Sequence, residues 1–253
     1  MDRIDAHSHL GTCRVFDSDQ SPSALVEAMD RHGIRASVVQ PFPGAPDARA
    51  VHDMIAALGQ DQPGRIFGMA SLSPHREPAE YKAEIRRCVE DLGFVGVKAH
   101  ALGHAINPRS RDARLVFETA AELGIPVMVH TGHGVPFAEP AMWIPLAQDF
   151  PNTTVILAHA GAPGYTGVAV IAAQMAPNVM LETSWVSPHD LARAIRTLGA
   201  ERVMFGSDLV FNPGHELAKY EAAGLSASDL ELCLAGNATR IFGLARAPVG
   251  AQA

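Results

Sequence analysis

The sequence lacks the features of a secreted, membrane or nucleic-acid-binding protein. Its 253 residues include only three cysteines (Cys13, Cys88 and Cys233), an odd and scattered set that cannot form a disulfide framework. No apolar run reaches the length of a membrane span, and no signal-peptide pattern precedes the first strand-like stretch. No basic run exceeds two residues and the formal net charge is -7, so no nucleic-acid footprint is visible. These absences predict a cytoplasmic protein that acts on a small molecule.

Several catalytic motifs are missing as well. The absence of a Gly-x-Ser-x-Gly elbow argues against a serine hydrolase. There is no His-Glu-x-x-His motif, and the glycine-containing stretch 161–167 lacks the Lys-Ser/Thr pair of a phosphate-binding loop. No Gly-x-Gly-x-x-Gly turn follows the first strand-like stretch, as an open dinucleotide-binding sheet would require. The chain does contain 12 histidines, so their placement becomes the informative feature.

Short apolar runs alternate with helical patterns along the whole chain. We predict strands at 3–10, 36–41, 65–72, 94–100, 126–130, 153–159, 179–184 and 202–208. We predict helices at 21–33, 47–58, 78–92, 111–123, 139–150, 167–175, 188–198, 214–223 and 228–242. The strands are almost continuously apolar, which is typical of parallel strands buried on both faces. Eight βα repeats without a linker predict an α/β protein with a single-domain (β/α)8 TIM barrel over residues 1–253, with a loose tail at about 245–253.

Two histidines, His7 and His9, end the first predicted strand. Residues i and i+2 of a strand project from the same face, so the two imidazoles can bind one metal ion. Chemistry in such barrels is carried by the C-terminal ends of the strands. The other strand ends carry further polar residues, namely Lys98, His100, His130, His159, Glu182 and Asp208. Singly, each could be a hydrogen-bonded histidine or a helix cap, but stability does not require polar residues at so many strand ends, so together they predict a metal site.

Six segments, in order along the chain, resemble the amidohydrolase superfamily, and within it the amidohydrolase-related ("amidohydrolase 2") branch. They lie at 4–9 (Ile-Asp-Ala-His-Ser-His), 96–98, 125–132, 157–161, 205–208 and 236–242. The resemblance implies a zinc-type divalent ion held by His7, His9, His130 and Asp208, with His159 beside it. The superfamily hydrolyses amides, esters, lactones and related bonds. Its amidohydrolase-related branch also holds non-oxidative decarboxylases and hydratases.

We therefore expect a metal-dependent hydrolase of a small ester, lactone or amide, with Zn2+ or another divalent ion, one per chain. The ion would lower the pKa of its bound water, and Asp208 would accept a proton and return it to the leaving group. His159 would either bind the metal or polarise a substrate oxygen. Lys98 stands where binuclear members of the superfamily carry a carbamylated bridging lysine. Our hypothesis is a mononuclear site, in which Lys98 would bind a substrate carboxylate or fill the pocket.

Three rival hypotheses stay open. The first is a non-oxidative decarboxylase that uses the same metal, with His159 or Asp208 moving the proton. The second is a metal-free lactonase in which Asp208 alone activates water. The third is a barrel that has kept the fold but serves as a binding or structural partner. The substrate is not given by the sequence, and the resemblance also allows a homo-oligomer.

Other residues near the predicted strand ends are expected to have supporting roles. Glu182 would hold a ligand histidine or simply end its strand. Trp143 would pack in the core or cover the mouth of the barrel, and Cys13 would be a small buried residue rather than a thiolate ligand. Residues that we expect only to line the pocket or shape its loops are His100, His104, His133, Ser184 and Trp185.

Overall fold

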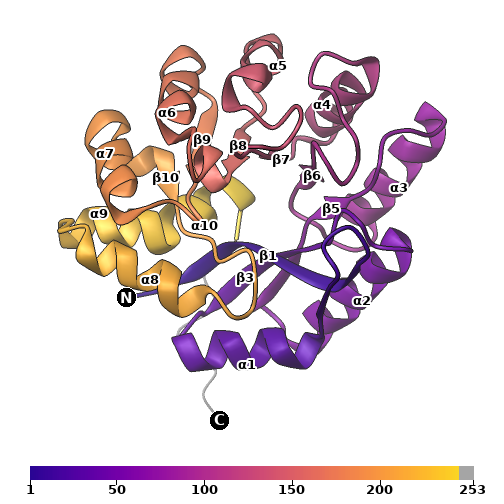
Figure 1. The fold of residues 1–253 in the computed structure, drawn as a ribbon. Helices are drawn as coiled ribbons and strands as arrows, with labels where there is room; N and C mark the ends of the chain where they lie inside the picture. Colours follow the sequence, from indigo (N-terminus) through magenta and orange to yellow (C-terminus); the bar gives the residue numbers. More distant parts are fainter. Residues whose placement is uncertain (245–253) are drawn as a thin grey trace.

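Ten strands and ten α-helices follow one another along residues 1–244, the part of the chain that the computed structural model describes (Figure 1). The predicted tail at 245–253 lies outside these residues. The strands are β1 (Ile4–Cys13), β2 (Ser18–Gln20), β3 (Ala36–Pro41), β4 (Ile66–Gly68), β5 (Ala70–Ser71), β6 (Val97–Ala99), β7 (Val127–His130), β8 (Val155–Ala158), β9 (Val179–Glu182) and β10 (Val203–Met204). The helices are α1 (Pro22–His32), α2 (Ala48–Asp61), α3 (Pro78–Glu90), α4 (Arg111–Leu123), α5 (Ile144–Asp149), α6 (Thr166–Met175), α7 (Pro188–Leu198), α8 (Pro213–Ala222), α9 (Ala227–Glu231) and α10 (Asn237–Phe242).

The parallel strands close into a ring. β1, β3 and β4 form one parallel ladder, and β5 to β10 form another in chain order. β4 and β5 are two halves of one strand interrupted at Met69, whose N–H donates to Val39 O. At the other join, Ala6 N–H donates to Phe205 O and Asp208 N–H to His7 O, so the end of β10 runs beside β1. With most helices surrounding this ring (Figure 1), the predicted α/β barrel is confirmed.

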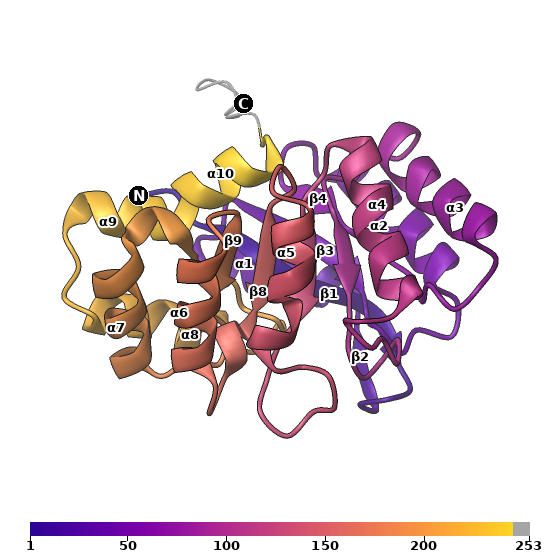
Figure 2. The same cartoon turned by 90° about the horizontal axis from the view of Figure 1, so that it is seen from above.

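Methionines and short apolar side chains fill the barrel interior. They come from successive strands and include Ile4, Ala6, Ala36, Val38, Met69, Met128, Ile156, Ala158, Met180 and Met204. Ala238 and Phe242 of α10 join the same cluster and close one end of the barrel. Figure 2 shows α10 at this end and β2 at the opposite end. The strands point their C-terminal ends toward β2, so that end is free to carry a site.

Local signals explain the helix boundaries that the sequence predicts well. Ser110 caps α4 by accepting the Ala113 N–H, and Gly124 ends the helix with φ 67°. Only glycine adopts this left-handed conformation without strain, so the chain leaves the helix there. α1 and α7 begin in the same way, at Ser21 and Ser187.

The predicted helix at 228–242 is helical throughout but is not uniformly α-helical. It consists of α9, a π-helical turn at Leu232–Gly236, and α10. The turn frees the carbonyl of Cys233 from the helix, and this carbonyl accepts the Phe205 N–H at the end of β10. The short strand β2, which pairs antiparallel with the extended end of β1, is also absent from the prediction. Both features arise from contacts between distant segments. No helix within residues 1–244 combines the length and the apolar character needed to cross a membrane.

Asp5 ties the first strand to the last. Its buried carboxylate accepts the backbone N–H of His7 and both the backbone N–H and the hydroxyl of Ser207. Burial raises the pKa of Asp5 to about 7, although these hydrogen bonds oppose the shift. The contact closes the barrel beside the predicted ligands.

We expect Asp5→Ala to lower the free energy of unfolding by roughly 2–4 kcal/mol, because it leaves the buried N–H groups of His7 and Ser207 without an acceptor. The measurement is urea unfolding followed by circular dichroism. The matched control is Asp2→Ala, which removes an exposed carboxylate paired with Arg35 and should cost less than about 1 kcal/mol. Equal effects of the two variants would contradict this role of Asp5.

Candidate metal centre

His7, His9 and Asp208 bring three ligand atoms together at the open end of the barrel. The Nε2 atoms of His7 and His9 are 3.2 Å apart. Asp208 Oδ1 lies 3.2 Å from His9 Nε2 and 3.5 Å from His7 Nε2. Two ligand atoms at zinc-type distances of about 2.0–2.1 Å and tetrahedral angles lie roughly 3.3 Å apart. The three atoms, which we call the ligand triangle, therefore have the dimensions of one divalent metal site.

Hydrogen bonds to the Nδ1 atoms of His7 and His9 determine which ring nitrogen presents a lone pair to the triangle. His7 Nδ1 lies 2.7 Å from Glu182 Oε2, and His9 Nδ1 lies 3.3 Å from Pro41 O. A carboxylate and a carbonyl only accept, so each Nδ1 carries the hydrogen and each Nε2 is left with a lone pair. Burial lowers the pKa of His7 well below its ordinary value, which keeps the ring neutral. Two imidazole lone pairs and a carboxylate oxygen that converge in this way form a donor set suited to a divalent ion, so the residues present fit one.

Two nitrogen donors also reach the triangle. Lys98 Nζ lies 2.9 Å from His7 Nε2, and Gln40 Nε2 lies 3.3 Å from His9 Nε2. Burial lowers the pKa of Lys98 to about 8. Sequence reasoning missed Gln40, although it stands at the end of a strand and the rule that selected the other residues would have found it.

A buried relay orients His159. The Ser184 hydroxyl donates to Glu182 Oε2, so its oxygen accepts the hydrogen of His159 Nδ1 at 2.7 Å. His159 Nε2 therefore keeps a lone pair. Burial lowers the pKa of His159 to about 4, and its ring centroid lies 5.0 Å from that of His7. His159 is thus a neutral hydrogen-bond acceptor beside the triangle.

His130 lies apart from the triangle. Its ring stacks on His100 with centroids 3.9 Å apart and meets His159 edge to face at 4.8 Å. Among residues 1–244, it belongs to no group of three ligand atoms that all lie within 4.8 Å of one another. The structure therefore brings together three of the four predicted ligands, and the fourth stands in the wall beside His159. A role of His130 in metal binding stays a prediction.

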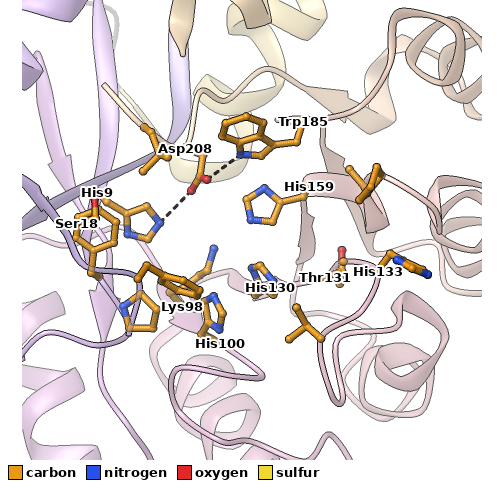
Figure 3. Close-up of a pocket in the computed structure, with 18 of the residues that line it drawn as sticks. His9, Ser18, Lys98, His100, His130, Thr131, His133, His159, Trp185 and Asp208 are labelled. Carbon is orange, nitrogen blue, oxygen red and sulfur yellow. Dashed lines mark hydrogen bonds and ion pairs between the residues drawn. The ribbon is translucent and has the colours of Figure 1, made fainter. Parts of the chain in front are cut away.

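Trp185 holds Asp208 in place. Its indole Nε1–H donates to Asp208 Oδ2 at 2.8 Å, which leaves Oδ1 to face His9 (Figure 3). Both residues have positive φ, 66° and 67°. The backbone N–H of Trp185 donates to Glu216 Oε1, and Glu216 forms a buried ion pair with Lys219. The sequence assigned Trp185 only to the pocket lining, because no local pattern reveals a partner 23 positions away.

A cavity of about 690 Å³ opens over the triangle. One part of its lining is polar and nitrogen-rich, with Lys98, His100, His130 and His159 around Asp208 (Figure 3). The other part is aromatic, with Phe16, Phe42, Trp185 and Phe211. His133 also lines the cavity, as expected.

The remaining predicted residues lie behind the cavity. His104 is buried, and its Nδ1 accepts the His100 N–H. Trp143 is buried in the core and stacks near Phe117, so it does not cover the mouth. Cys13 is a buried free thiol that belongs to none of the metal-type clusters found among residues 1–244.

A second cluster of metal-type side chains, His52, Glu84 and Cys88, is structural. The Ser71 N–H donates to His52 Nε2, so His52 Nδ1 carries a hydrogen and donates it to Glu84 Oε1 at 3.0 Å. Both nitrogens of His52 are therefore engaged, and no lone pair is left for an ion. Arginine side chains also bind Glu84. The cluster links α2 to α3.

Known proteins resemble this chain in sequence or in fold. A γ-resorcylate decarboxylase of Polaromonas sp. (strain JS666 / ATCC BAA-500) is 26% identical over 87% of each chain. A 2-keto-4-carboxy-3-hexenedioate hydratase of Sphingobium sp. (strain NBRC 103272 / SYK-6) is 25% identical over 82% of this chain and 76% of its own. The solved structure of a dihydroxybenzoic acid decarboxylase from Polaromonas sp. JS666, with manganese and 2-nitroresorcinol bound, has a TM-score of 0.74 at 22% identity over 97% of this chain and 98% of that one.

The family assignment rests on a match along nearly the whole chain. The model of the family described as Amidohydrolase matches residues 4–244. This span includes every strand of the barrel and all three residues of the ligand triangle. The chain therefore belongs to the Amidohydrolase family.

Proposed function

We propose that this protein is a metal-dependent decarboxylase that releases CO2 from a flat aromatic or unsaturated acid without oxidising it. The observation that carries the proposal is the cavity over the ligand triangle. One part of its lining holds a lysine and several imidazoles, and the other part is aromatic. Aromatic side chains stack favourably on a flat ring, and the cation attracts a carboxylate. The decarboxylase relative, whose sequence matches over 87% of both chains, supports this reaction over the hydrolysis that the sequence favoured.

The carboxylate of the substrate would meet the polar part of the cavity lining. Lys98 is the only lysine or arginine among the described residues that line it. His159 presents a lone pair there, which accepts a hydrogen bond from a hydroxyl or an amine on the substrate. The cavity is thus suited to a ring that carries both a carboxylate and a hydrogen-bond donor.

The ligand triangle, His7, His9 and Asp208, would hold the divalent ion, with His159 and His130 as neighbouring nitrogens. When bound, the ion supplies a fixed positive charge that orients anionic oxygens of the substrate. Mn2+ and Zn2+ both accept imidazole and carboxylate ligands. The solved decarboxylase relative holds manganese.

Decarboxylation needs one proton at the carbon that carries the carboxylate. Once this carbon is protonated, the bond to the carboxylate breaks, its electron pair returns to the ring, and CO2 leaves. Asp208 is placed to carry the proton, because it borders the cavity and Trp185 fixes its orientation. We propose that Asp208 takes this proton from solvent that enters the cavity and delivers it to the carbon, so that its carboxylate is regenerated and each turnover consumes one solvent proton.

We expect about one divalent ion per chain in protein purified without chelator, measured by elemental analysis. His7→Ala should lose it, because the variant removes one corner of the triangle. His133→Ala, which changes a cavity histidine outside the triangle, is the control and should keep the ion. An ion-free wild-type protein would contradict the metal site, and two ions per chain would indicate a binuclear centre.

We expect CO2 release when the metal-loaded enzyme is incubated with hydroxybenzoic acids such as 2,6-dihydroxybenzoate. Asp208→Asn should lower kcat at least 100-fold, because it removes both the proton carrier and a carboxylate ligand of the triangle. Asp17→Asn changes another carboxylate of the cavity lining and should have little effect. Cleavage of esters or lactones without any CO2 release would instead support the hydrolase.

Trp185→Phe should lower kcat about tenfold and leave the metal content unchanged. The variant keeps the aromatic wall but removes the hydrogen bond that orients Asp208, a loss of the size of one hydrogen bond to a charged group. Steady-state kinetics alongside elemental analysis checks this expectation. An unchanged kcat would show that Asp208 does not depend on Trp185.

A further inference from the structure

We infer that Lys98 and the divalent ion compete for one lone pair of His7, so that metal binding releases Lys98 into the substrate cavity. The inference rests on the metal site of the proposed function and assigns to Lys98 a task beyond it. It makes Lys98 a substrate-binding residue whose location depends on the metal.

The competition follows from the geometry of a single atom. His7 Nδ1 is engaged by Glu182, so Nε2 has one lone pair, directed in the plane of the ring. Lys98 Nζ lies 2.9 Å from this atom and donates to it. A metal ion in the ligand triangle uses the same lone pair. One lone pair cannot serve both cations, so binding of the ion must displace the ammonium.

Lys98 has little to hold it once it leaves His7. Its side chain is fully buried, and the contact with His7 is its only hydrogen bond within residues 1–244. An ammonium group has three donors, so two lack a protein partner even in this arrangement. A divalent ion at the triangle would repel the displaced charge. Since Lys98 lines the cavity, the cavity is the space into which Nζ can move.

The displacement couples the metal site to the substrate site. In the cavity, all three donors of Lys98 become available to a carboxylate, while the ion occupies the triangle. Coupling of this kind is reciprocal, so an acid that binds Lys98 also favours metal binding. The expected order of assembly is metal first and carboxylate second.

The first test measures Mn2+ affinity by isothermal titration calorimetry on chelator-treated protein. Lys98→Met keeps an unbranched side chain one atom shorter than lysine but removes its charge and donors, so Kd for Mn2+ should tighten about tenfold or more. Lys82→Met is the matched control, because it removes a lysine charge from an exposed pair with Glu122 and should leave Kd unchanged. An unchanged Kd in Lys98→Met, with normal binding by wild type, would overturn the competition. Failure of wild type to bind Mn2+ would instead overturn the metal site itself.

The second test uses no variant and covers the case in which Lys98→Met does not fold. The chain has three lysines, Lys82, Lys98 and Lys219, so side-chain spectra of 15N-lysine-labelled protein contain few signals. Diamagnetic Zn2+ should shift the Lys98 Nζ resonance and leave those of Lys82 and Lys219 in place. Benzoate added to the Zn2+-loaded protein should shift the Lys98 resonance again. The same addition to metal-free protein should give a smaller shift. A Lys98 signal that is indifferent to Zn2+ would overturn the inference.

Discussion

The carboxylate of Glu182 is the contact on which the candidate site depends. It lies fully buried at the end of β9 and accepts hydrogen bonds from His7 Nδ1, the His159 backbone, and the backbone and hydroxyl of Ser184. Through these bonds one side chain fixes the tautomer of His7 directly and that of His159 through Ser184. A Cβ atom at Gly206 would lie 2.6 Å from Glu182 Oε1, so the segment that follows β10 must carry glycine there. The lone pairs that face the metal position therefore follow from the buried carboxylate behind them.

Closure of the barrel and assembly of the site use the same residues. Asp5 joins the end of β10 to β1, and the Asp208 N–H donates to His7 O immediately beside the ligand triangle. In helix α8, Glu216 of the buried pair Glu216–Lys219 accepts the Trp185 N–H, and Trp185 in turn orients Asp208. A change in this closure would displace ligand atoms as well as lower stability. Such coupling is expected where functional groups stand on the ends of rigid strands rather than on free loops.

The contacts around Lys98 link the two halves of the site. One nitrogen of His7 faces both the ligand triangle and the Lys98 ammonium, and Lys98 in turn borders the cavity. In the proposed function, the cation, the lysine and the substrate carboxylate would thus share one small region around the lone pair of His7 Nε2. Whether the metal ion or the Lys98 ammonium binds this lone pair would determine whether Lys98 is free to bind the substrate carboxylate.

The sequence by itself determined the barrel and the chemical type of the site. Apolar runs in strict alternation with helices define a parallel barrel. The C-terminal end of each strand follows from sequence order alone. The sequence therefore placed five polar residues at one end of the barrel, namely His7, His9, Lys98, His159 and Asp208. Only the tertiary structure decided which of them meet. Three contacts join segments that are far apart in the chain: Trp185 with Asp208, Lys98 with His7, and the π-helical turn with the end of β10. The separation of His130 from the triangle likewise depends on how distant strand ends pack. Periodicity in the sequence indicates which face of a helix or strand is buried. Distances between strand ends instead depend on side-chain packing across the barrel, and a single sequence carries no local signal of this packing.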